Sequence, residues 1–97
     1  MINVKFEAYV SDLQFKEANT TKKNEYIIFK AYHEVDKRVV CVCFDAKIVE
    51  FFSKELNNIK GMKFEISGLL KIDTKKIGVG IFQNNIIIHA TNIKLVV

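Results

Sequence analysis

The 97-residue sequence contains no proline, no tryptophan and a single arginine. It also has no apolar run approaching the roughly 20 residues that a membrane-spanning helix needs. Its first residues alternate between apolar and polar and lack the basic and apolar regions of a signal peptide. We therefore expect a cytoplasmic domain without membrane association, in which Cys41 and Cys43 remain thiols.

The formal net charge of +4 comes almost entirely from lysine, because Arg38 is the only arginine. Lysine binds phosphate as a point charge, whereas the planar guanidinium of arginine is better suited to hydrogen bonding with base edges. This balance favours binding to a nucleic-acid backbone over readout of a base sequence. An ordinary lysine-rich surface is the alternative, and composition alone does not separate the two. The lack of tryptophan counts mildly against a base-stacking site, although Phe and Tyr can also stack.

Alternating hydrophobicity predicts a chain made mostly of strands. The expected strands are residues 2–10, 25–35, 39–44, 62–72, 77–83 and 86–97. Polar stretches rich in Asn, Asp, Thr and Lys predict the connections at residues 11–24, 36–38, 73–76 and 84–85. In the first strand, Ile2, Val4, Phe6, Ala8 and Val10 share one face.

One amphipathic helix is predicted between the third and fourth strands. Asp45 is a suitable N-cap for a helix over Ala46–Asn57, and Gly61 follows its end. Its apolar positions at helical spacing are Ile48, Phe51, Phe52, Leu56 and Ile59.

This order predicts an all-β fold with one helix. A lone helix between the third and fourth strands is typical of the OB-fold, a five-stranded Greek-key barrel. Gly68 interrupts the fourth strand, as glycine does where a barrel strand bends sharply. We expect residues 1–97 to form a single OB-fold domain.

The stretch Arg38–Leu70 resembles the middle of the bacterial single-stranded-DNA-binding (SSB) proteins. The matching segments are Val40–Phe44, Ala46–Leu56, Lys60-Gly61, Phe64–Leu70 and, for the final strand, His89–Leu95. The family usually has glycine where this sequence has Tyr9 or Val10, and again where it has Asp45. Family members also carry an acidic tail that recruits partners, and this sequence ends at Val97. The resemblance implies a tail-less SSB-like protein, of the kind found on plasmids, phages or other mobile elements.

The first candidate site lies on the outward face of strands one to three. It combines aromatic and basic side chains: Lys5, Tyr9, Lys30, Tyr32, Arg38 and Phe44. Every base has a face on which an aromatic ring can stack, and a neighbouring cation neutralises phosphate, so such a surface binds single strands without a sequence code. The resemblance assigns base stacking to Phe44. The alternative is structural: Tyr9 and Tyr32 pair across strands and Phe44 fills the core.

Lysines in two loops extend this candidate site. Lys22 and Lys23 lie in the first loop, and Lys75 and Lys76 lie in the later turn, with Lys71 just before it. In OB-folds such loops flank the binding cleft, although solvated turn lysines are an equally good interpretation.

The remaining groups of polar and sulfur-containing residues match no catalytic or metal-binding pattern. Cys41 and Cys43, with His33 and His89, make a poor zinc set, because structural zinc takes cysteines from turns and not from consecutive inward strand positions. No catalytic triad, phosphate-binding glycine loop or carboxylate pair is present. We expect no cofactor, no metal and no enzymatic activity.

Phe51 and Phe52 offer a second functional hypothesis. Adjacent helical residues point about 100° apart, so one of the two is a candidate for a partner-binding surface. The chain would then be an OB-fold interaction subunit for a polymerase, helicase or primase, resembling the primosomal replication-restart OB protein. A charged strand face favours DNA, and a contiguous apolar patch favours a protein partner. First strands of SSB domains pair across a dimer, so we also expect a homodimer or higher oligomer through Ile2–Val10.

Overall fold

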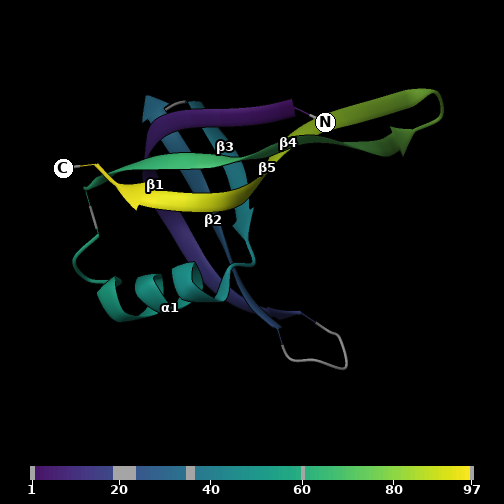
Figure 1. Cartoon of the computed structure of the whole chain (residues 1–97). Helices are drawn as coiled ribbons and strands as arrows, with labels where there is room; N and C mark the ends of the chain where they lie inside the picture. Colours follow the sequence, from purple (N-terminus) through teal and green to yellow (C-terminus); the bar gives the residue numbers. More distant parts are fainter. Residues whose placement is uncertain (1, 19–23, 35–36, 60, 97) are drawn as a thin grey trace.

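The computed structural model describes residues 2–18, 24–34, 37–59 and 61–96. The elements in these ranges are β1 (Ile2–Ala18), β2 (Asn24–Glu34), β3 (Lys37–Cys43), α1 (Ala46–Glu55), β4 (Lys63–Gly78) and β5 (Ile81–Leu95). The strands close a barrel in the order β1-β2-β3-β5-β4. Neighbouring strands are antiparallel except β3 and β5, which are parallel. The predicted five-stranded OB-fold, with its helix between the third and fourth strands, is confirmed (Figure 1).

The core consists of the inward side chains of the barrel and one side of α1. Phe52 of α1 is fully buried, and its ring centroid lies 6.3 Å from that of Phe29 on β2 and 5.4 Å from that of Phe64 on β4. Helix α1 therefore covers one end of the barrel, as Figure 1 shows beneath the strands. Leu56, one of the apolar positions of the predicted helix, is 45% exposed, and Met62 and Ile72, at the two ends of the predicted fourth strand, are 40% and 62% exposed.

The start of α1 follows from its first residues. The Asp45 carboxylate accepts hydrogen bonds from the backbone amides of Lys47, at 3.0 Å, and Ile48, at 3.1 Å. These two amides have no partner within the helix, so the predicted N-cap satisfies them. The helix ends at Glu55, two residues before the predicted Asn57.

The predicted loop over residues 11–24 is wrong for most of its length. β1 continues to Ala18 and pairs with β2 as far as the register Ala18↔Asn24. A β-bulge at Asp12 and Leu13 lets the strand turn without ending, because two residues of β1 there oppose one residue of β2. Lys22 and Lys23 lie outside the described residues.

The predicted turns at residues 73–76 and 84–85 are also wrong. Both segments are strand, and they pair with each other through Asp73↔Asn85 and Lys75↔Gln83. β4 and β5 thus run on beyond the barrel as one two-stranded arm, clearly visible in Figure 1. The arm reverses at Val79 and Gly80, where Gly80 has φ +70°. Both faces of the arm meet solvent, so its strands need no apolar alternation. The polar residues of these strands therefore resemble turn residues in the sequence.

Gly68 lies where β4 meets β5 with a register shift. A Cβ at this position would collide with the His89 carbonyl oxygen and would lie 2.8 Å from the Cα of Ala90. The close approach of two backbones therefore requires glycine here, although β4 continues through Gly68 and is not interrupted as predicted.

Candidate nucleic-acid interface

The candidate interface is the outward surface of β2, β3 and their neighbours, which we call the strand face. Ile27, Phe29, Cys41 and Cys43 are fully buried or nearly so. Side chains alternate along a strand, so the residues between them point away from the core. The resulting strand face comprises Tyr9, Tyr26, Ile28, Lys30, Tyr32, Arg38, Val40, Val42, Phe44, Lys63, Lys71, Ile87 and His89.

One row of this face crosses four strands. The Cα partners are Arg38↔Tyr32, Tyr32↔Tyr9 and Tyr9↔Lys63. The two tyrosine rings lie 5.7 Å apart at 37°. The Arg38 guanidinium carbon is 5.3 Å from the Tyr32 ring centroid, and the Lys63 ammonium is 5.6 Å from that of Tyr9. Both distances are typical of cation–π contacts, so a cation flanks the tyrosine pair on each side.

A second aromatic group lies at the other end of the face. The Phe44 ring stacks on Tyr26, with centroids 4.9 Å apart at 30°, and lies 6.3 Å from the His89 ring. Phe44 is 52% exposed, so it does not fill the core as the structural alternative required. The ring therefore presents a free face to solvent beside its partner.

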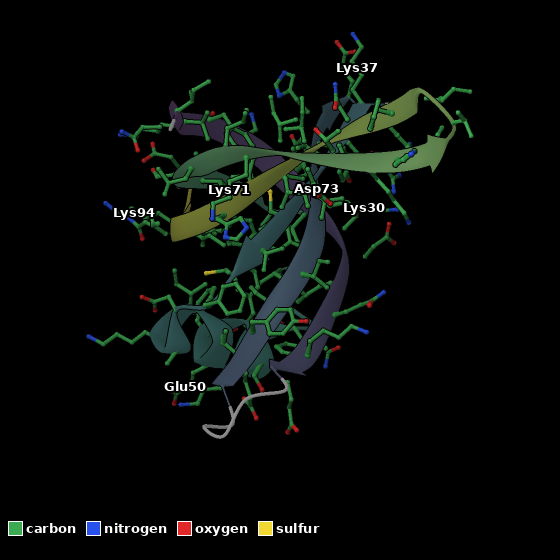
Figure 2. All side chains as sticks on the ribbon, turned by 90° about the vertical axis from the view of Figure 1, so that its right-hand side faces the viewer. Lys30, Lys37, Glu50, Lys71, Asp73 and Lys94 are labelled. Carbon is green, nitrogen blue, oxygen red and sulfur yellow. The ribbon has the colours of Figure 1, made fainter. Side chains whose placement is uncertain are left out.

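Between the two groups runs a row with cations on both sides. Lys30 pairs with Val40, Val40 with Ile87, and Ile87 with Lys71, across four adjacent strands. Lys30 and Lys71 thus flank the partly buried side chains of Val40 and Ile87. Figure 2 shows both lysines at mid-height on the sheet, well away from Glu50 on α1. The arrangement offers an apolar strip with a positive charge on each side.

The structure brings together six of the residues predicted for nucleic-acid binding: Tyr9, Lys30, Tyr32, Arg38, Phe44 and Lys71. Lys5 shares the outward side of β1 with Tyr9, but it pairs with Ser67 farther along β4, and its ammonium forms an ion pair with Glu65 at 3.4 Å. Lys75 and Lys76 lie on the arm, and as neighbours in one strand they point to opposite faces. By the same alternation Lys75 shares its face with Lys71.

Arg38 belongs to β3 and not to the predicted turn. Its guanidinium donates a hydrogen bond to the Asp12 carboxylate at 3.3 Å and lies 3.5 Å from the Ser11 hydroxyl oxygen. Lys30 lies 3.7 Å from the same carboxylate oxygen. Two cations of the strand face therefore share one acidic partner.

Burial and the nearby positive charge of Lys71 lower the pKa of His89 below its ordinary value. His89 is therefore neutral near neutral pH, and it contributes a ring and not a charge to the face.

Burial raises the pKa of the Cys41 thiol to about 12, and the pKa of the Cys43 thiol is raised for the same reason. Within the described residues, no cluster of three or more His, Cys, Asp or Glu side chains is arranged to hold a metal ion.

The two phenylalanines predicted for partner binding divide between surface and core. Phe52 is completely buried because the helix turns that ring into the barrel, so Phe52 is not the partner-binding candidate of the pair. Phe51 is 42% exposed and touches Phe52 edge-on, with centroids 5.5 Å apart. Only Phe51 of this pair remains available to a partner.

No helix among the described residues is long and apolar enough to cross a membrane.

Seven of the thirteen strand-face residues were missing from the site predicted from the sequence, and so was Asp12, which pairs with two cations of the face. Tyr26 could have been found, because it follows from the strand alternation that placed Tyr32 outward, whereas Lys63 and His89 join the face through their pairing with β1 and β3. Asp12 could not have been found, since its position depends on a β-bulge inside a segment predicted as a loop.

A comparison with solved structures identifies a similar fold. The mitochondrial single-stranded DNA binding protein Rim1 of S. cerevisiae superimposes with a TM-score of 0.74 over 97% of this chain and 93% of that chain. The two sequences are 11% identical, so the likeness shows a shared OB-fold. Neither a protein-family model nor a curated protein matches the sequence.

Proposed function

We propose that the chain binds single-stranded DNA through the strand face, without preference for a base sequence. The observation that carries this proposal is the clustering of aromatic rings with cations on one surface. All three tyrosines of the sequence and the half-exposed Phe44 lie on that surface. The OB-fold shared with a single-stranded DNA binding protein supports the same conclusion.

Binding would combine stacking with charge neutralisation. Bases stack on Phe44 and on the Tyr9–Tyr32 pair, and each stacked base contributes about 1–3 kcal/mol. Phosphates lie near Lys30, Lys71 and Arg38, while sugars and base edges cover the apolar strip of Val40 and Ile87. Only one of these cations is an arginine, so the face holds little that reads base edges. The role is binding alone and involves no chemistry.

The arm extends this path beyond the barrel. By strand alternation, Lys75 lies on the arm face that continues from Lys71, and Ile77 follows near the tip. Ile77 is 59% exposed, and Val79 at the reversal is 96% exposed. In OB-folds the connection between the fourth and fifth strands helps to hold oligonucleotides. We therefore include the Lys75 face of the arm in the DNA path, and Lys76 lies on the other side.

The first half of β1 suits a homodimer. Residues 2–9 pair with β4, whereas pairing with β2 begins only at Tyr9. Among the described residues, the second edge of residues 2–8 has no strand partner. An open strand edge of this kind pairs readily with another copy.

An interaction subunit of a replication complex is the second candidate function. Phe51 and Leu56 are 42% and 45% exposed near the end of α1, on an element that adds nothing to the strand face. Such side chains suit contact with a polymerase, helicase or primase. In this case DNA affinity would be weak or absent.

A fluorescence-anisotropy titration separates the two functions. We expect labelled oligo-dT to bind more tightly than duplex DNA of the same length. If Lys30, Lys71 and Arg38 each neutralise one phosphate, the log–log salt slope is about −2, at roughly −0.7 per contact. Equal affinity for both DNA forms, or a flat salt response, would overturn the proposal. No binding at low salt would favour the interaction subunit.

A further inference from the structure

Asp12 occupies an unusual position in the middle of β1. The β-bulge between Ser11 and Gln14 gives Asp12 a φ of +52°, the only positive φ outside glycine among the described residues. Asp and Asn are among the few residues that tolerate this left-handed conformation. The bulge keeps the Asp12 carboxylate on the outer surface, while Leu13 packs against the core.

The carboxylate of Asp12 pairs with two cations of the strand face at once. Its Oδ2 atom lies 3.3 Å from Arg38 Nη1 and 3.7 Å from Lys30 Nζ. The Asp12 side chain is 52% exposed, and those of Lys30 and Arg38 are 50% and 37% exposed. Exposed ion pairs contribute little to folding stability. The positive φ therefore accounts for Asp or Asn at this position, but folding stability does not account for the charge of Asp between these two cations.

Lys30 and Arg38 are cations that the proposed DNA site needs for phosphate, so this inference rests on the proposed function. A carboxylate and a phosphate are both anions with oxygen ligands, and they compete for the same ammonium and guanidinium donors. We propose that Asp12 is an internal competitor of the DNA backbone: it holds Lys30 and Arg38 in the free protein and must yield them to phosphate when a single strand binds.

Two effects follow from this competition. The first is that Asp12 weakens DNA binding, because one negative charge stays beside the incoming phosphates. The second is that it keeps Arg38 over the Tyr32 ring until DNA arrives, which leaves the Tyr32 face partly covered in the free protein. Asp12 thus sets the affinity and eases release of the strand.

The test compares Asp12→Asn with the unchanged protein. Asparagine keeps the shape of the side chain and tolerates the positive φ, so the bulge is preserved. We expect Asp12→Asn to bind oligo-dT roughly tenfold more tightly at low salt. That factor corresponds to removing the repulsion between unit charges about 6 Å apart at an effective dielectric constant of about 40. The log–log salt slope should steepen by about 0.7 for each additional phosphate that is neutralised.

Glu50→Gln is the matched control. Glu50 also pairs with a lysine, Lys54, at 2.8 Å, and its substitution changes the net charge by the same amount. It lies on α1, well below Lys30 in the view of Figure 2. Glu50 lines one cavity with Phe44, but its partner Lys54 is not a cation of the strand face. Its substitution therefore releases no proposed phosphate ligand, and at moderate salt we expect less than about a twofold change in affinity.

The outcomes separate this inference from the proposed function. Suppose that the unchanged protein binds oligo-dT, but Asp12→Asn binds it no more tightly than the unchanged protein or than Glu50→Gln. In that case Asp12 is not a competitor, and the proposed function stands. Weaker binding would mean that Asp12 positions Arg38 favourably for DNA, which contradicts competition. If none of the three proteins prefers oligo-dT to duplex DNA, both proposals fail.

Discussion

Phe44→Ala separates stacking on DNA from packing within the fold, because the chain offers a matched control in Phe51→Ala. Phe44 is 52% exposed and stacks on Tyr26 at 4.9 Å, whereas Phe51 is 42% exposed and meets Phe52 edge-on at 5.5 Å. Each ring is half-buried with one aromatic ring less than 6 Å from its centroid, and Phe44 also lies 6.3 Å from the His89 ring. Only Phe44 lies on the strand face.

The expected stability losses are therefore similar. About half of the roughly 1.5–3 kcal/mol for complete burial of a Phe side chain applies to each ring. The aromatic contact adds about 0.5–1.5 kcal/mol. Each variant should lose about 1–3 kcal/mol of unfolding free energy, below the roughly 3–5 kcal/mol typical of a core Phe→Ala change. Phe52→Ala, at a fully buried position, should reach that larger range.

The expected DNA affinities differ. Loss of one stacked base, about 1–3 kcal/mol, weakens binding roughly 5- to 150-fold for Phe44→Ala. Phe51→Ala should bind like the unchanged protein. Urea melts and oligo-dT anisotropy on the three proteins supply both quantities. A folded Phe44→Ala with unchanged affinity, or an equal loss in the two variants, would refute the stacking role of Phe44.

Three other predictions concern the fold and its assembly. Gly68→Ala should cost about 3 kcal/mol in a urea melt, because its Cβ would meet the His89 carbonyl, whereas Gly78→Ala has its nearest atom at 3.5 Å and should cost far less. The pKa of His89 is lower in the folded chain than its ordinary value, so the unfolded chain binds more protons as the pH falls through the ordinary His range. As the pH is lowered from about 7.5 to about 5, the unchanged protein should therefore lose stability relative to His89→Gln, and parallel pH profiles would contradict this. Light scattering at high micromolar concentration should show at least a dimer, and a mass of 11.2 kDa would exclude pairing through β1.

The barrel itself could be predicted from the sequence because its strands are half-buried. Ile27, Phe29 and Ala31 alternate with outward residues, and all three prove to be buried. The N-cap at Asp45 was equally predictable, since a single carboxylate satisfies two helix amides. In these segments the local pattern and the tertiary environment agree.

The arm could not be predicted in the same way. Thr74 and Asn84 read as turn residues, yet in the structure the Thr74 hydroxyl lies 2.9 Å from the Asn84 side-chain oxygen across the paired strands. A hairpin with solvent on both faces leaves no periodic apolar signal, so backbone pairing alone defines it. The bulge at Asp12 is hidden for a similar reason, because it depends on the register between β1 and β2.

The candidate site was predictable where it depended on strand alternation and not where it depended on register. Alternation placed Tyr32 and Lys30 on one face, and the structure confirms that placement. The partners across the sheet, such as Ile87 and His89 beside β3, follow from the parallel pairing of β3 with β5. That pairing joins distant parts of the chain, and no local pattern reports it.

Intrinsic tyrosine fluorescence tests the central claim most directly. The sequence has no tryptophan, and Tyr9, Tyr26 and Tyr32 all lie on the strand face, so the emission reports on that surface alone. Titration with oligo-dT, corrected for absorption with free N-acetyltyrosinamide, should give saturable quenching that is reversed by salt and is much weaker with duplex DNA. Emission that stays unchanged while labelled oligo-dT demonstrably binds would place the DNA elsewhere and contradict the account.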